Sequence, residues 1–105
     1  MPQRPPTDEC SRRLGVLAEA TRLAIIRALM EGPLRVGVIG ERLCVEQSLL
    51  SHHLRALRES GLVVAMRQGK GVVYRLADGV RPSKSREAIH LGCCRLTFEP
   101  KEPTS

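Results

Sequence analysis

The residues best suited to chemistry in this 105-residue chain lie between positions 47 and 60. Leucines recur there at the spacing of one helical face, at Leu50, Leu54 and Leu57. The other sides of such a helix carry amide, hydroxyl, imidazole and guanidinium groups, which can hydrogen-bond base edges and phosphates in a major groove. We therefore expect this helix to read DNA through Gln47, Ser48, Ser51, His52 and Arg55.

A basic hairpin is expected to follow this helix. The runs 62–67 and 72–76 are rich in β-branched residues and are separated by the turn-forming residues 68–71. Arg67 and Lys70 would lie near the tip, where they can contact a phosphate or enter a minor groove. The alternative is a turn that is merely solvated. The Gly-Lys-Gly sequence lacks the further residues that a nucleotide-binding phosphate loop needs.

Four cysteines form the second group of reactive side chains. Cys93 and Cys94 are adjacent, and with a third thiol they could form a trigonal sulfur site for a soft, thiophilic metal ion or for arsenite. We expect Cys10 to be that third ligand if the two ends of the chain meet at a dimer interface. Two alternatives stay open, namely a thiol switch modified by an oxidant or a persulfide, and simple packing. Cys44 is expected to be a small, semi-buried residue at a helix end.

Composition favours a polyanionic partner. The chain has 17 basic and 11 acidic residues, a net charge of +6 and a pI near 9.8. Tyr74 and Phe98 are the only residues among Phe, Trp and Tyr, so binding of single strands by base stacking is poorly supported. The sequence contains no Cys-X-X-Cys and no visible pairing of a cysteine with a catalytic base, so we do not expect an enzyme.

The length predicts one small domain over residues 1–105, with a core at 8–77 and a tail at 78–105. The N-terminal segment has no apolar run, so we expect neither a signal peptide nor a membrane span, and a cytoplasmic location. Thiols in that compartment are normally reduced, which argues against a disulfide framework.

Further elements must position the polar helix. We expect one helix after a Thr7 cap, a second after a Thr21 cap and a third over about 36–43. Glu46 stands where a Ser or Thr cap would be usual for the polar helix, and glutamate caps only weakly. Residues 89–98 alternate in polarity with a change of phase at the cysteine pair, which predicts a strand or extended segment with a kink.

Five short motifs occur along the chain between residues 17 and 74. They are Leu17-Ala18-Glu19-Ala20-Thr21-Arg22-Leu23, Leu43-Cys44-Val45-Glu46-Gln47-Ser48, Ser51-His52-His53-Leu54, Leu57-Arg58-Glu59-Ser60-Gly61-Leu62-Val63 and Gly69-Lys70-Gly71-Val72-Val73-Tyr74. Together they resemble the ArsR-type winged helix-turn-helix repressors over about residues 14–77. The resemblance implies an α+β, mainly helical fold with a β-hairpin wing. Many proteins of this type end in a long helix that pairs across the dimer, whereas the alternation at residues 89–98 predicts a short C-terminal strand or extended tail here. It also implies a homodimeric repressor that leaves its double-stranded DNA operator when it senses something.

The resemblance also assigns roles within the helices. His53 matches the family's histidine and flanks the leucine stripe, so we expect it to pack and hydrogen-bond inside the domain, with base contact as the alternative. His52 lies on an outward side of the helix, where we expect it to contact DNA, with a merely solvated side chain as the alternative. Arg22 belongs to a family Thr-Arg pair and either pairs with a carboxylate such as Glu19 or contacts a phosphate.

Two metal sites of the family are not supported by this sequence. Arg35-Val36-Gly37 replaces the Cys-Val-Cys box, and His90 alone remains of the C-terminal set. The sequence therefore predicts no certain cofactor. Arsenite or another thiophilic metal ion is the candidate ligand. The alternative function is a winged-helix module that binds DNA or protein without a small-molecule effector.

Overall fold

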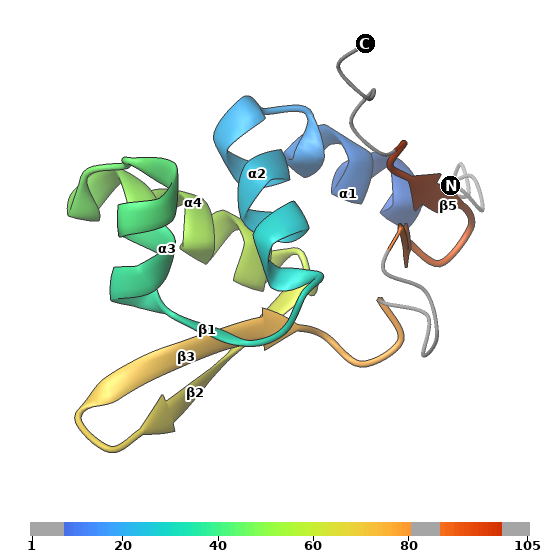
Figure 1. The fold of residues 1–105 in the computed structure, drawn as a ribbon. Coiled ribbons are helices and arrows are strands. Elements are labelled where there is room, and N and C mark those ends of the chain that lie inside the picture. Colours follow the sequence, from blue (N-terminus) through green and yellow to red (C-terminus); the bar gives the residue numbers. More distant parts are fainter. Residues whose placement is uncertain (1–7, 81–86, 100–105) are drawn as a thin grey trace, which may run out of the picture.

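The structure, a computed structural model, describes residues 8–80 and 87–99 (Figure 1). These residues form four helices and five strands. In chain order they are α1 (Asp8–Leu17), α2 (Ala20–Leu29), β1 (Leu34–Arg35), α3 (Val36–Leu43), α4 (Gln47–Glu59), β2 (Val63–Gln68), β3 (Gly71–Leu76), β4 (Ala88–His90) and β5 (Arg95–Thr97). The α+β, mainly helical class is confirmed. None of the helices in the described part of the chain has the length and apolar character that a bilayer crossing needs.

The helices pack around one hydrophobic core. On α4 the three leucines of the predicted stripe, Leu50, Leu54 and Leu57, are at most 2% exposed. They pack in one cluster with fully buried residues such as Ile26 of α2 and Ile39 of α3. Because one face of α4 is buried here, its other faces must point to solvent.

The turn between α3 and α4 is built from Cys44 and Glu46. Cys44 ends α3 in the left-handed region, with φ 54°, and its backbone N–H donates to the carbonyl of Glu41. Cys44 is exposed, so the expectation of a semi-buried residue is wrong. The Glu46 carboxylate caps α4 by accepting from the backbone N–H groups of Ser48 and Leu49.

The wing is an antiparallel sheet with strand order β1-β3-β2. β2 and β3 pair from Val63 with Leu76 out to Gln68 with Gly71, and Gly69 turns between them at φ 64°. β1 pairs with the inner part of β3, which anchors the wing to the start of α3. Figure 1 shows the hairpin projecting from the helical body below α3 and α4.

The C-terminal segment is a two-stranded hairpin, not the single kinked strand that the sequence predicted. β4 and β5 are antiparallel, with Ile89 opposite Leu96, and the Leu91 N–H donates to the Cys94 carbonyl across the turn. Gly92 lies in that turn at φ 102°. The phase change in the sequence is therefore a reversal of the chain. Figure 1 shows this hairpin beside α1, at the end of the molecule away from the wing tip.

The start of α2 also differs from expectation. The helix begins at Ala20, and the cap is Glu19 rather than Thr21, because a Glu19 carboxylate oxygen accepts from the Arg22 backbone N–H at 2.9 Å. The backbone N–H of Arg22 is the largest influence that lowers the pKa of Glu19. The expected Thr7 cap lies outside the described residues.

The Glu46 cap makes the stability of α4 depend on pH. Its pKa lies below the ordinary value, chiefly because the Ser48 hydroxyl donates to the carboxylate and then because of the two backbone N–H groups. A lowered folded-state pKa contributes stability above the unfolded pKa, and this contribution is lost as pH falls through the folded pKa. We expect Glu46→Gln to lower the melting temperature at neutral pH, with a deficit that is full above the ordinary carboxyl pKa of 4.5 and shrinks over the range below it, as pH falls through the lowered pKa of Glu46. Thermal unfolding followed by circular dichroism measures this. A deficit that stays constant over that range would contradict the assigned cap.

Candidate nucleic-acid interface and cysteine cluster

All seven residues predicted to contact DNA are exposed. They lie on α4 and on the β2–β3 hairpin, and they are Gln47, Ser48, Ser51, His52, Arg55, Arg67 and Lys70. We call them the reading surface. Because α4 turns its leucine face into the core, the polar side chains of this set project outward, beside a basic wing.

Two members of the reading surface already have acidic partners within the chain. The Ser48 hydroxyl donates to the Glu46 carboxylate at 2.7 Å, and the Arg55 Nε donates to Glu59 at 3.1 Å. Both side chains of the Arg55–Glu59 pair are more than 60% exposed, and such a pair contributes little to stability. A DNA phosphate can therefore replace Glu59 as the partner of Arg55 at small cost.

Helix α4 is tied to the wing and to α2 by two arginine contacts. The Arg58 guanidinium donates to the Tyr74 hydroxyl of β3 at 3.4 Å, and the Arg22 Nε donates to His53 Nδ1 at 3.0 Å. His53 is buried, so the expectation of a packed, hydrogen-bonded histidine is confirmed. Arg22 is neither simply paired with the Glu19 side chain nor turned outward to a phosphate. Its guanidinium fixes the His53 ring on α4, and its backbone N–H caps α2.

Leu49 is a surface residue that the sequence reasoning missed. It lies in the first turn of α4, between Ser48 and Leu50, and is 48% exposed. An apolar side chain on a reading helix can contact the methyl group of thymine in a major groove. The sequence could have predicted this exposure. Leu49 falls outside the helical spacing of Leu50, Leu54 and Leu57, so it could not share their buried face.

The cysteine cluster consists of Cys10 on α1 and of Cys93 and Cys94 in the turn between β4 and β5. Cys10 and Cys93 form a disulfide with a Cα–Cα distance of 5.9 Å, and the Cys94 sulfur lies 3.2 Å from that of Cys10. All three sulfurs lie within 4.8 Å of one another. Cys10 is buried, whereas the other two residues are exposed.

This cluster departs from the sequence expectation in two respects. The three cysteines meet inside one chain, so the cluster does not need a dimer interface to assemble. A disulfide is also present where reduced thiols were expected. Three sulfurs that share one ion at about 2.3 Å lie roughly 4 Å apart, which the observed spacing accommodates once the disulfide is opened. The sulfur donors suit a soft ion better than a hard one.

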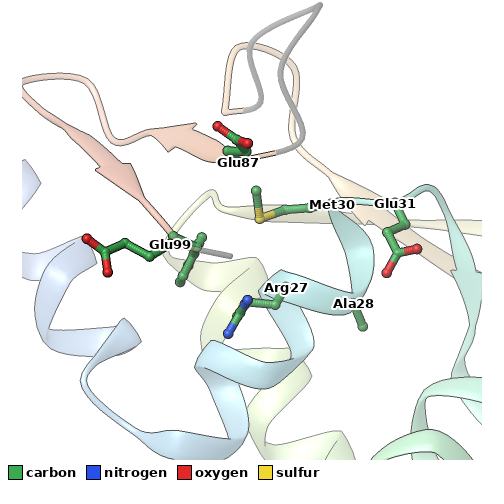
Figure 2. Close-up of a pocket in the computed structure, with 7 residues that line it drawn as sticks. Arg27, Ala28, Met30, Glu31, Glu87 and Glu99 are labelled. Atoms are coloured by element: carbon green, nitrogen blue, oxygen red, sulfur yellow. The ribbon is translucent and has the colours of Figure 1, made fainter. Parts of the chain in front are cut away.

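A hollow of about 410 Å³ lies on another face, between α2 and the end of the β4–β5 hairpin (Figure 2). The Arg27 guanidinium stacks over the Phe98 ring at 5.0 Å, and the carboxylates of Glu31, Glu87 and Glu99 are grouped around it. Three of its seven lining residues are glutamates, and none of the seven belongs to the reading surface.

Comparison with known proteins shows which family this chain resembles. The family model described as "Bacterial regulatory protein, arsR family" matches residues 19–64. The HTH-type transcriptional regulator NmtR of Mycobacterium tuberculosis is 48% identical over 77 residues. That alignment covers 73% of this chain but 64% of NmtR, so the chain matches somewhat less than two thirds of that relative.

Two solved structures resemble the fold at appreciable identity. HlyU from Vibrio cholerae matches with a TM-score of 0.69 and 33% identity, covering 72% of this chain and 83% of that one. A Mycobacterium bovis domain described as a homodimeric winged helix-turn-helix DNA-binding domain matches with a TM-score of 0.64 and 30% identity. That match covers 73% of this chain and 76% of the other. From the motif match, the identities and the shared winged helix-turn-helix fold, the chain belongs to the arsR family of bacterial regulatory proteins.

Proposed function

We propose that this chain is a homodimeric transcriptional repressor that binds a double-stranded DNA operator and is released by a thiophilic effector at the cysteine cluster. The observation that carries the DNA-binding part is the reading surface. Its seven polar or basic residues are exposed together on α4 and the wing of a chain with a net charge of +6. Repression would follow from blocking polymerase at the operator, in the cytoplasm.

The proposed complex places α4 in a major groove and the wing on flanking phosphates. In a dimer, the two α4 helices would enter successive major grooves about 34 Å apart on a pseudo-palindrome. A relative with the same fold from Mycobacterium bovis is described as homodimeric, which supports a dimer. Leu14 of α1 is 42% exposed, which supports α1 as part of the pairing face.

The DNA contact predicts a specific change in salt dependence. Arg55→Ala and Lys70→Ala should each weaken binding to DNA from the gene's upstream region and reduce the slope of log affinity against log salt by about one. The measurement is fluorescence anisotropy of labelled DNA over a series of salt concentrations. Arg12→Ala is the matched control, because it removes the same charge from an exposed position on α1. Unchanged slopes in both surface variants, or an equal change in Arg12→Ala, would refute the assigned surface.

The effector part of the proposal is supported by the three clustered sulfurs. A dithiol reductant first converts the Cys10–Cys93 disulfide into two thiols and is itself oxidised to a disulfide. Arsenous acid then exchanges its three hydroxyl groups for the three thiols of the cluster, releasing three water molecules. Binding acts on repression only if the effector prefers the arrangement that does not fit DNA.

A thiol switch is the second candidate, and the disulfide itself favours it. Cytoplasmic disulfides are usually transient and redox-sensing rather than structural. In this version an oxidant, not arsenite, would join Cys10 and Cys93 and change the affinity for DNA. A winged-helix module without any effector is the remaining alternative.

Titration of the DNA-bound, reduced protein separates these candidates. We expect arsenite to weaken DNA binding by about 5-fold to 150-fold, the usual range of such coupling. The double variant Cys93→Ser, Cys94→Ser should lose this response, whereas Cys44→Ser should keep it, since Cys44 lies outside the cluster. Release by an oxidant alone would select the thiol switch. Tight binding that neither arsenite nor an oxidant disturbs would remove the effector part and leave the repressor.

A further inference from the structure

We propose that Arg13 is the positioning residue that couples the cysteine cluster to the reading helix. The inference rests on the proposed effector function, since it explains how a ligand at the cysteines would reach α4 within one subunit. Arg13 lies on α1, three residues after Cys10 and so about one helical turn along. Its side chain is 20% exposed, which makes it one of the less accessible arginines of this basic chain.

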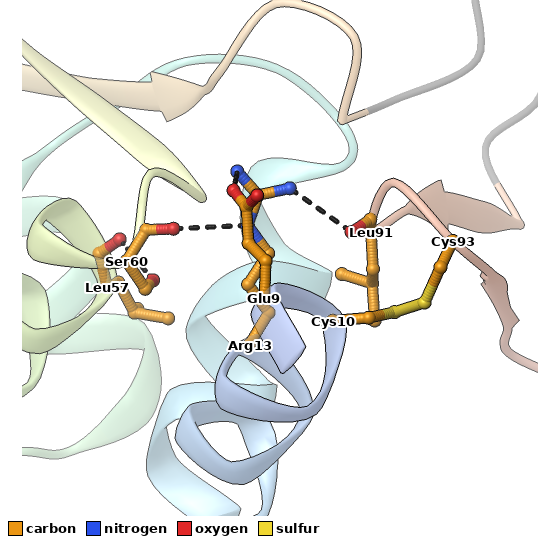
Figure 3. A network of polar contacts seen from close by, with 7 residues as sticks. All are labelled: Glu9, Cys10, Arg13, Leu57, Ser60, Leu91 and Cys93. Carbon is orange, nitrogen blue, oxygen red and sulfur yellow. Dashed lines mark hydrogen bonds and ion pairs between the residues drawn. A yellow bond between two sulfur atoms is a disulfide. The ribbon is translucent and has the colours of Figure 1, made fainter. Parts of the chain in front are cut away.

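The Arg13 guanidinium bridges the two elements that must communicate (Figure 3). Its Nε donates to the backbone carbonyl of Ser60, the residue that ends α4, at 3.2 Å. Its Nη1 donates to the backbone carbonyl of Leu91, at the start of the turn that carries Cys93 and Cys94, also at 3.2 Å. Its Nη2 pairs with Glu9 at 3.3 Å, which orients the group from its own helix.

Two glycines line the gap that the guanidinium fills. Gly61 follows α4 at φ 79°, and an added Cβ there would lie 3.2 Å from Arg13 Nη2. Gly92 lies in the cysteine turn at φ 102°, and an added Cβ there would lie 3.9 Å from Arg13 Nη1. The backbones of both elements can therefore approach Arg13 closely, in conformations that L side chains rarely adopt.

The cysteine turn is held to α1 at two points. One is the Cys10–Cys93 disulfide, and the other is the hydrogen bond from Arg13 to Leu91. Leu91 and Cys94 are joined across the turn by a backbone hydrogen bond of 2.9 Å. When the sulfurs of this turn change their bonding partners, the turn therefore moves relative to α1, and the Leu91 carbonyl moves with it.

The other side of the bridge is the junction between the reading helix and the wing. After Ser60 and Gly61, the Leu62 N–H donates to the Leu57 carbonyl of α4 at 3.1 Å. The Leu62 carbonyl in turn accepts from the N–H of Ala77, directly after β3, at 3.0 Å. A shift at Ser60 is thus passed to both elements of the reading surface.

The coupling follows from the geometry of one guanidinium bonded to two carbonyls. In the reduced protein the thiols of Cys10, Cys93 and Cys94 are not joined, whereas one bound ion draws all three sulfurs to itself, so the turn settles differently on α1. Arg13 then cannot keep both carbonyls in good hydrogen-bond geometry. The arrangement of the Ser60 end of α4 therefore differs between the free and the loaded protein, which is the differential contact that coupling requires.

The test measures the coupling itself in the reduced full-length protein. DNA affinity is determined by anisotropy with and without arsenite, and arsenite affinity is determined from sulfur charge-transfer absorbance with and without DNA. In the wild type we expect arsenite to weaken DNA binding about 10-fold and DNA to weaken arsenite binding by the same factor. Arg13→Ala should bring both factors below about 2-fold while arsenite still binds.

Two further variants keep the result unambiguous. Arg13→Lys preserves the charge but offers one amino group in place of the planar fork, so it should also lose the coupling, even if Arg13→Ala proves unstable. Arg12→Ala removes an exposed neighbouring arginine and should retain the wild-type factor. A wild-type factor in both Arg13 variants would overturn the inference while leaving the effector function intact. Absence of any coupling in the wild type would overturn the effector function and, with it, this inference.

Discussion

The burial of one face of α4 is the constraint on which the rest of the structure depends. Burying each of Leu50, Leu54 and Leu57 contributes roughly 1.5–3 kcal/mol, so the rotation of this helix about its axis is strongly fixed. A rotation by one residue would bring Arg55 and Arg58 towards the core at a large desolvation cost. The polar face therefore has to point outward, and the wing, joined to α4 through Arg58 and Tyr74, lies beside it.

The helical elements could be predicted because their signals are local. Helix α3 has the predicted bounds, and α4 ends one residue from the expected end, since each carries a clear apolar period. Strand β1 was missed because two residues are too short to show any period. The reversal at Gly92 was taken for a kink, since one glycine between short alternating runs does not distinguish the two. Glu19 displaced Thr21 as a cap because the geometry of the helix start, not residue preference alone, selects the oxygen.

The two functional surfaces differ in how far the sequence could define them. The reading surface follows from residue type and helical spacing, so its members could be named in advance. The cysteine cluster joins Cys10 to a residue 83 positions away, and only the packing of the C-terminal hairpin on α1 brings them together. The Arg13 bridge is less visible still, because its acceptors are backbone carbonyls, which carry no sequence signal. The proposed DNA contacts come from the middle of the chain, whereas the thiol cluster is assembled from its first helix and its C-terminal hairpin.

The most direct test of this account is a titration of isotope-labelled, reduced protein with DNA from the upstream region, followed by amide NMR spectra. The account predicts that the largest shift changes fall on the first turns of α4 and on the wing tip, at Gln47, Ser51 and Lys70. It predicts much smaller changes around the hollow lined by Arg27 and Glu99, which lies outside the reading surface. Changes centred on that face, with α4 and the wing unaffected, would contradict the central claim.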